Sequence, residues 1–256
     1  MLTFAALMSK YFIELKYDGT NYHGWQIQNN ANSVQAEVNK ALSTLFQSEI
    51  MVMGAGRTDT GVHAQQLFAH FDIEKDIDTT QLVFKLNTLL PADISCSNAS
   101  LVNAEAHARF SATARTYEYW ITPTKNPFLI NKAYYFTKAL DIDLMNKAAE
   151  MLKDYTDFSC FSKSNTDTHT NNCDITFAQW QQADDKLIFT ISADRFLRNM
   201  VRAIVGTLLD VGTKKISLAD FNQIILSKNR SNAGTSAPAH GLYLTEVKYP
   251  KEVFNG

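Results

Sequence analysis

Segments with the two-residue period of β-strands alternate along this chain with segments that have the 3.6-residue apolar period of helices. This order limits the folds available to the chain more than any other feature of its sequence. In the first half the expected order is strand Tyr11–Tyr17, helix Ser33–Phe46, strands Ile50–Met53 and Leu67–Phe71, helix Thr80–Leu90 and strand Ile94–Val102.

The second half shows the same order of elements without a sequence repeat. The expected elements are strand Thr116–Thr122, a helix from Asp141 or Asp143 to Leu152, strands Ile175–Gln182 and Leu187–Ala193, helix Leu197–Val211 and strand Gly241–Tyr249. Strand-helix-strand-strand-helix-strand in each half predicts an α+β fold of two RRM-like or ferredoxin-like halves with a mixed, mainly antiparallel sheet. We expect the halves to be residues 9–105 and 106–256.

The charge balance weakly disfavours a nucleic-acid partner. The chain carries 24 Lys and Arg against 26 Asp and Glu, for a net charge of −2. Phosphate binding depends on local basic surface, however, and Arg195, Arg198 and Arg202 fall within one short stretch among apolar residues. The later clusters Lys214–Lys215 and Lys228–Arg230 are interpreted as solvated faces.

Cysteine usage and hydropathy indicate a soluble cytoplasmic protein. Cys96, Cys160 and Cys173 are odd in number and form no C-x-x-C pair, so neither a disulfide framework nor a zinc site is expected. No apolar stretch is long enough to span a bilayer. The apolar run before Met8 is too short for a secretory signal, and Met8 is itself a candidate start.

The most informative segment is the loop Gly54–Ala64, GAGRTDTGVHA. Its glycine spacing fits neither the P-loop nor the dinucleotide fingerprint, which disfavours a nucleotide cofactor. Asp59 stands two residues after Arg57, and a carboxylate beside a guanidinium stays ionised, as a nucleophile must. From these residues alone, the alternative is that Asp59 caps a turn and Arg57 pairs with some carboxylate.

This loop resembles the active-site signature G-R-T-D-x-G-V-H-A of the A-type tRNA pseudouridine synthases. Further segments resemble the same family in the expected order, namely Tyr17–Gln26, Ser33–Gln35, Ala106–Tyr119, Phe196–Arg202 and Ala237–Leu244. The resemblance implies an enzyme that converts uridines at positions 38–40 of the tRNA anticodon stem-loop to pseudouridine. It also implies a homodimer, an active-site cleft between the halves, and no metal or other cofactor.

The resemblance assigns roles to single residues as well. Asp59 matches the nucleophile, which attacks either C1′ of the ribose or C6 of the base. Tyr117 matches the tyrosine that contacts the target base, although periodicity alone would make it a core aromatic. Arg202 matches the arginine that pairs with the aspartate, and Arg57 matches the residue that displaces the target base or fills the gap it leaves.

The remaining assignments concern contacts with the RNA backbone. Arg195 and Arg198 are interpreted as residues that contact phosphates and take no part in catalysis. The family often has an arginine in a T-x-x-R-x-I segment, where this chain has Cys173. Three alternatives stay open: a non-catalytic RNA-binding module, a hydrolase of another class that uses Asp59, and a synthase acting on other positions or other RNA.

Overall fold

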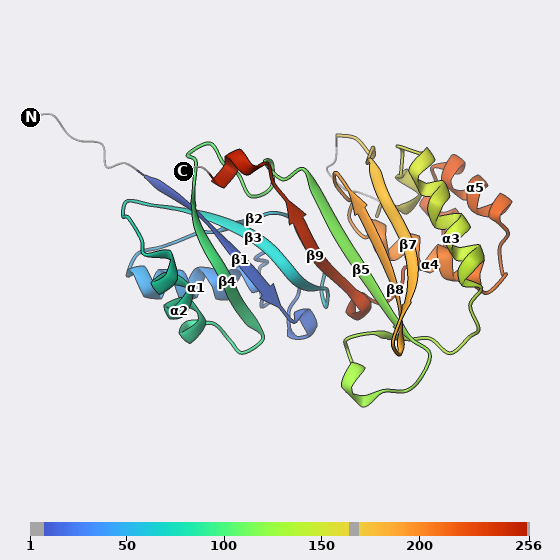
Figure 1. Cartoon of the computed structure of the whole chain (residues 1–256), viewed down its shortest axis with the longest axis horizontal. Coiled ribbons are helices and arrows are strands. Elements are labelled where there is room, and N and C mark those ends of the chain that lie inside the picture. Colours follow the sequence, from blue (N-terminus) through green and yellow to red (C-terminus); the bar gives the residue numbers. More distant parts are fainter. Residues whose placement is uncertain (1–7, 164–168, 255–256) are drawn as a thin grey trace, which may run out of the picture. The chain divides into compact units, whose positions relative to one another are not determined.

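The computed structural model describes residues 8–163 and 169–254 and divides into two units, which are coloured by sequence in Figure 1. Unit 1 runs to Thr113 and resumes at Leu244, whereas unit 2 is Ala114–Tyr243. Each unit combines helices with mainly antiparallel strands, and one strand pair is parallel. The expected α+β class with a mixed, mainly antiparallel sheet is confirmed.

The described part of unit 1 contains five strands and two α-helices. They are β1 (Ser9–Tyr17), α1 (Val34–Phe46), β2 (Met53–Gly54), β3 (His63–Ile73), α2 (Thr79–Leu89), β4 (Ile94–Val102) and most of β9 (Leu242–Lys248), with short 3₁₀ helices at Gly19–Asn21 and Lys251–Phe254. The strand order is β4-β1-β3-β9, and β2 also pairs with β3. Strand β1 is therefore central, which explains why it is buried on both faces.

The two faces of β1 pack against different segments. Tyr11 stacks on Phe71 of β3, with ring centroids 5.9 Å apart. On the other face, the Phe12 ring lies 5.3 Å from that of Tyr249 and 6.1 Å from that of Phe254. The last described residues of the chain thus complete the core that the first strand begins.

The division between the units differs from the one expected at residues 105 and 106. Residues 106–113 belong to unit 1, because Ala108 N donates to His70 Nδ1 (3.1 Å) and Tyr249 Oη donates to Ala108 O (2.5 Å). The last strand, which was expected in the second half, begins in unit 2 and continues from Leu244 in unit 1.

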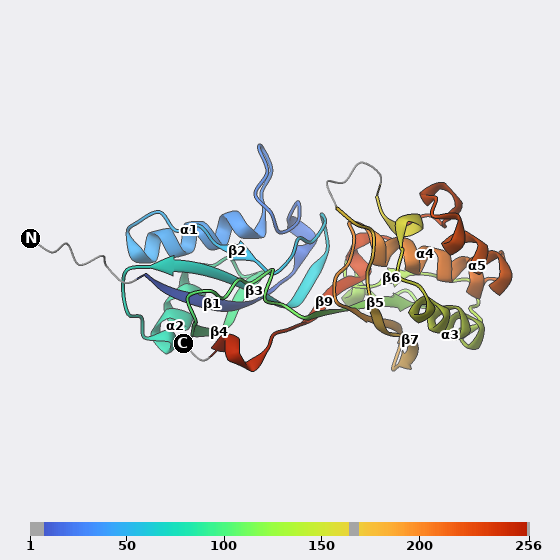
Figure 2. The same cartoon turned by 90° about the horizontal axis from the view of Figure 1, so that it is seen from above.

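Unit 2 contains a second group of strands and helices. They are β5 (Ala114–Thr122), β6 (Tyr134–Tyr135), α3 (Ile142–Met151), β7 (Ile175–Ala183), β8 (Lys186–Ala193), α4 (Met200–Gly212) and α5 (Leu218–Ser227), with 3₁₀ helices at Pro127–Leu129, Leu152–Asp154, Ser159–Phe161, Arg230–Asn232 and Ala239–Gly241. Strands β5, β8 and β7 pair in that order, and β6 adds to β5 in parallel. Figure 2 shows α3, α4 and α5 side by side, and they contact one another.

Helix α4 begins three residues later than expected and ends one residue later. Asn199 has a left-handed backbone (φ 65°), so helical geometry starts only at Met200. Gly212, expected just beyond the helix, is its last residue, and Thr213 is the C-cap. As a result, Arg198 precedes the helix, as Arg195 does, and of these three arginines Arg202 alone lies on it.

His70 links β3 to the segment that leads out of unit 1. Its Nδ1 accepts the hydrogen bond from Ala108 N, and only 8% of the residue is exposed. Burial, assisted by the nearby His107 and Lys10, lowers the pKa of His70 to about 4. Protonation at Nδ1 would also break the bond to Ala108, so folding keeps this imidazole neutral.

We expect unit 1 to lose stability as pH falls from about 6.5 to about 4. In this window the unfolded chain protonates His70 and the folded chain does not, so the free energy of unfolding rises with pH. The full effect is on the order of 3 kcal/mol. Urea unfolding across this range should show a shallower pH slope for His70→Asn, whose amide oxygen still accepts from Ala108 N.

The matched control is His169→Asn, because His169 is exposed. It should leave the slope of stability against pH as it is in the wild type. Equal slopes for wild type and His70→Asn would contradict the role assigned to His70.

Candidate active site

Asp59 lies in the loop that joins β2 to β3 in unit 1. The loop begins where Ala55 N donates to Phe68 O (2.7 Å) and ends at His63, the first residue of β3. Asp59 is half-buried, Arg57 is exposed, and Thr58 between them is buried. The loop therefore presents the carboxylate and the guanidinium on either side of an anchored residue.

The backbone around Asp59 is bonded to the segment Tyr17–Trp25, which we call the clamp segment. Thr58 O accepts from Trp25 N (3.2 Å), and Gly61 N donates to Tyr22 O (3.2 Å). The hydroxyls of Tyr17 and Thr58 are hydrogen-bonded at 2.8 Å. Residues before and after Asp59 are thus fixed to one segment, which limits the movement of the carboxylate.

Two glycines of the clamp segment allow this close approach. A Cβ on Gly19 would lie 2.0 Å from Val62 O, and a Cβ on Gly24 would lie 2.3 Å from Thr58 O. Gly24 also has a φ of +94°, a backbone conformation that L side chains rarely adopt. Any side chain at either position would displace the loop.

The clamp segment is itself anchored at Asp93, just before β4. Asp18 N donates to Asp93 O (2.9 Å), and the Tyr22 hydroxyl donates to Asp93 Oδ1 (2.6 Å). Burial, followed by this bond to the carboxylate, raises the pKa of Tyr22 above its usual value, which keeps the hydroxyl a donor. Asp93 was missed at the sequence level because nothing in its neighbourhood distinguishes it.

His63 connects the end of the loop to the clamp segment. Its buried Nδ1 lies 3.0 Å from Gly19 N and 3.0 Å from Asp18 Oδ1. A neutral imidazole accepts from the glycine amide, whereas a protonated one pairs with the carboxylate. Either contact holds the clamp segment at Asp18 and Gly19 against the end of the loop.

Tyr117 is the fourth residue of β5 in unit 2 and is half-buried. Its ring makes a T-shaped contact with Phe196, with centroids 5.2 Å apart. Tyr119, two residues further on, is fully buried, and its hydroxyl donates to Pro238 O (2.7 Å). The aromatic face of β5 therefore runs from the core to a partly accessible tyrosine.

Arg202 is half-buried on α4 and is bonded twice to Ala237. Its Nε donates to Ala237 O (2.8 Å), and Ala237 N donates to Arg202 O (2.9 Å). A Cβ on Gly206, one turn further along α4, would lie 1.8 Å from Thr235 O. Segment 233–237 therefore lies directly on the helix and sets the orientation of the guanidinium.

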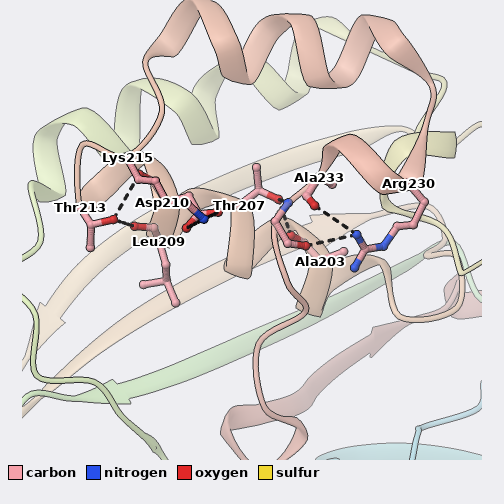
Figure 3. A network of polar contacts seen from close by, with 9 residues as sticks. Ala203, Thr207, Leu209, Asp210, Thr213, Lys215, Arg230 and Ala233 are labelled. Atoms are coloured by element: carbon pink, nitrogen blue, oxygen red, sulfur yellow. Dashed lines mark hydrogen bonds and ion pairs between the residues drawn. The ribbon is translucent and has the colours of Figure 1, made fainter.

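Two side chains hold segment 233–237 in place, one from α4 and one from just before the segment. Figure 3 shows these two residues, Thr207 and Arg230, lying against it. Thr207 Oγ1 accepts from Gly234 N (2.9 Å), and Arg230 Nη2 donates to Ser236 Oγ (2.8 Å). Arg230 was interpreted from the sequence as part of a solvated face, and the structure corrects this. Its guanidinium bonds to loop atoms no more than six residues further along the chain. Such local contacts in a loop produce no periodic pattern in the sequence, so the sequence does not predict them.

Arg195 and Arg198 lie on the irregular segment between β8 and α4. Arg195 is half-buried and Arg198 is exposed. Asp194 Oδ1 accepts from both Arg195 N (2.8 Å) and Asp174 N (2.7 Å), which fixes the start of this segment. Lys163 N donates to Arg198 O (3.1 Å) and fixes its end.

Cys173 is buried beside this segment. It is 2% exposed, its Sγ lies 3.9 Å from Met200 Sδ, and burial raises the pKa of its thiol to about 12. The residue is therefore a neutral packing group at a position where the family often has an arginine.

Within residues 8–163 and 169–254, no group of three or more His, Cys, Asp or Glu side chains could hold a metal ion. None of the helices in the same ranges has the length and hydropathy needed to cross a membrane.

The loop of Asp59, its clamp segment and the helix of Arg202 all fall within residues 15–111 and 148–250, which match the family model described as tRNA pseudouridine synthase. The chain belongs to this family. Tyr117 falls between the two matched segments of the tRNA pseudouridine synthase model.

Curated relatives of this family match along nearly the whole chain. Proteins named tRNA pseudouridine synthase A are 52% identical in Bacteroides thetaiotaomicron, covering 97% of this chain and 93% of the relative, and 53% identical in Bacteroides fragilis, covering 96% and 99%. The protein of that name in Parabacteroides distasonis is 51% identical, covering 96% and 98%.

We expect Gly24→Ala to destabilise the protein by roughly 2 kcal/mol or more, because it adds a clash with Thr58 O and strain at a positive φ. The matched control is Gly56→Ala in the loop that carries Asp59, where a Cβ would meet nothing within 4 Å. The control should stay within about 0.5 kcal/mol of wild type or gain slightly. Urea unfolding measures both, and equal losses would contradict the clamp.

Proposed function

We propose that this chain isomerises uridine to pseudouridine in tRNA, with Asp59 as the nucleophile. The observation that carries the proposal is the anchoring of Asp59 by backbone bonds from Trp25 to Thr58 and from Gly61 to Tyr22. A nucleophile held in one position loses little entropy on reaching the reacting atom. The family membership of the chain supplies the substrate, a uridine of tRNA.

The chemistry needs no external reagent. The N1–C1′ bond of uridine breaks, the uracil turns, C5 bonds to C1′, and the proton lost from C5 is balanced by one gained at N1. Product and substrate are isomers, so no oxidant, reductant or energy source enters the balance. A carboxylate at Asp59 assists by attacking either C1′ of the ribose or C6 of the base.

Three further residues are assigned to substrate binding. Tyr117 offers an aromatic ring, held by Phe196, on which an extruded uracil can stack. Arg57 is exposed beside the nucleophile and is assigned to the gap that the displaced base leaves. Arg202 has its guanidinium oriented by Ala237 O and is assigned to the bound nucleotide. Arg195 and Arg198 are assigned to phosphates.

The finer parts of the proposal follow from the family resemblance. The target uridines are those at positions 38–40 of the anticodon stem-loop, and the enzyme works in the cytoplasm as a homodimer. A uridine in a stem must leave its stack before it can react, which requires the protein to replace its stacking contacts. Sedimentation equilibrium tests the dimer, and mapping of pseudouridine along the tRNA tests the positions.

The decisive experiment is release of tritium from tRNA that carries 5-tritiated uridine, because rejoining through C5 expels that atom. Wild type should release tritium, and Asp59→Asn should be at least about a thousandfold slower, since removal of a nucleophile abolishes the covalent step. The control is Asp76→Asn, an exposed aspartate in the same unit, which should react like wild type. Binding of tRNA by Asp59→Asn shows that the variant is folded.

Two outcomes would overturn parts of this proposal. Tritium release that persists in Asp59→Asn would keep the activity and remove Asp59 as the nucleophile. No release by wild type from any tRNA would remove the isomerase function and favour a non-catalytic RNA-binding protein.

A further inference from the structure

Residues 107–111, which we call the Phe110 turn, form a rigid projection of unit 1. Ala108 is fully buried and is held on both sides, since its N donates to His70 Nδ1 and its O accepts from the Tyr249 hydroxyl. Ser111 closes the turn, because its N donates to His107 O (2.9 Å) and its Oγ accepts from His107 N (3.0 Å). The turn therefore has little freedom relative to the core.

Phe110 projects from this turn with 76% of its surface exposed. Its orientation is nevertheless fixed. The Arg109 and Phe110 amides both donate to His107 Nδ1 (3.1 and 3.3 Å), and the His107 ring lies 4.4 Å from the Phe110 ring. Arg109 Cζ lies 5.5 Å from the centroid of the same ring. The result is an exposed aromatic ring, already ordered, with a cation beside it.

The surroundings of the ring favour an anionic partner over an apolar one. Lys10 is already paired, with its Nζ bonded to Ala104 O (2.6 Å) and 3.8 Å from Asp72 Oδ1, so Arg109 is the cation that faces the ring. Burial first, and then the charge of Lys10, lowers the pKa of His107, so Nδ1 stays an acceptor for both amides at neutral pH. An apolar protein surface placed over this ring would also desolvate Arg109, which costs free energy.

We propose that Phe110 and Arg109 form a second contact with the tRNA, in which an unpaired base stacks on Phe110 and Arg109 contacts the adjoining phosphate. The inference rests on the proposed function for the identity of the RNA. Stacking suits this role because every base has a π face, and the fixed ring loses little entropy on binding. Neither residue belongs to the set assigned above to the target uridine.

The test compares dissociation constants for an unmodified tRNA transcript, measured by filter binding with the full chain. Phe110→Ala and Phe110→Leu should each weaken binding about tenfold, whereas Phe110→Trp should stay within about threefold of wild type. The matched control is Phe84→Ala on α2, where the phenylalanine is 72% exposed and should leave affinity unchanged. The rescue by tryptophan and not by leucine separates stacking from general apolar contact.

A second arm tests Arg109 through salt dependence. Arg109→Gln should reduce the slope of log affinity against log salt concentration by about 0.7 to 0.9, the value for one phosphate contact. An unchanged slope would remove the phosphate contact from the proposal.

Three results would overturn the stacking site. They are wild-type affinity in Phe110→Ala, wild-type affinity in Phe110→Leu, and a Phe110→Ala variant that sediments at a lower mass, which would make the ring a contact between copies of the chain. Failure of the proposed function is distinguishable, since it appears as no tritium release by wild type while the binding comparison is still measurable.

Discussion

The carbonyl of Thr58 approaches the Cα of Gly24 so closely that no side chain fits at that position. This contact joins the clamp segment to the loop of Asp59, and the order of the loop depends on it. A loop rich in glycine pays a large entropy cost on folding. Here that cost is offset by hydrogen bonds to the clamp segment on both sides of Asp59, so Asp59 is held by residues far from it in sequence.

The same arrangement recurs in unit 2 with different residues. Gly206 of α4 permits close contact with Thr235 O. Segment 233–237, which contains Thr235, accepts a hydrogen bond from Arg202 at Ala237 O. In both units a side chain of the candidate site is positioned by a second segment, and a glycine makes the approach possible. Substitutions at these glycines would act on the site without touching substrate.

Much of the fold and the central loop could be predicted from the sequence, because periodicity and turn chemistry are local. Strand β4 has the bounds that its pattern predicts, and the α+β order is that of the alternating periods. The predicted start of α4 was wrong, because the left-handed backbone of Asn199 cannot be recognised from the spacing of apolar residues. The role of Arg230 was also missed. Its partners are loop atoms, and a run of basic residues does not distinguish a solvated side chain from one that bonds a loop.

Strand β9 and the residues after it have a consequence for how the protein is made. The core around Phe12 needs Tyr249 and Phe254. A ribosome therefore releases an incomplete unit 1 first, and it delivers Tyr249 and Phe254 only after the whole of unit 2. Until then the apolar surface that Tyr249 and Phe254 cover beside Phe12 stays exposed in the nascent chain, which is the kind of surface that chaperones bind. The order of translation thus makes unit 2 the first part able to fold completely, although Asp59 belongs to unit 1.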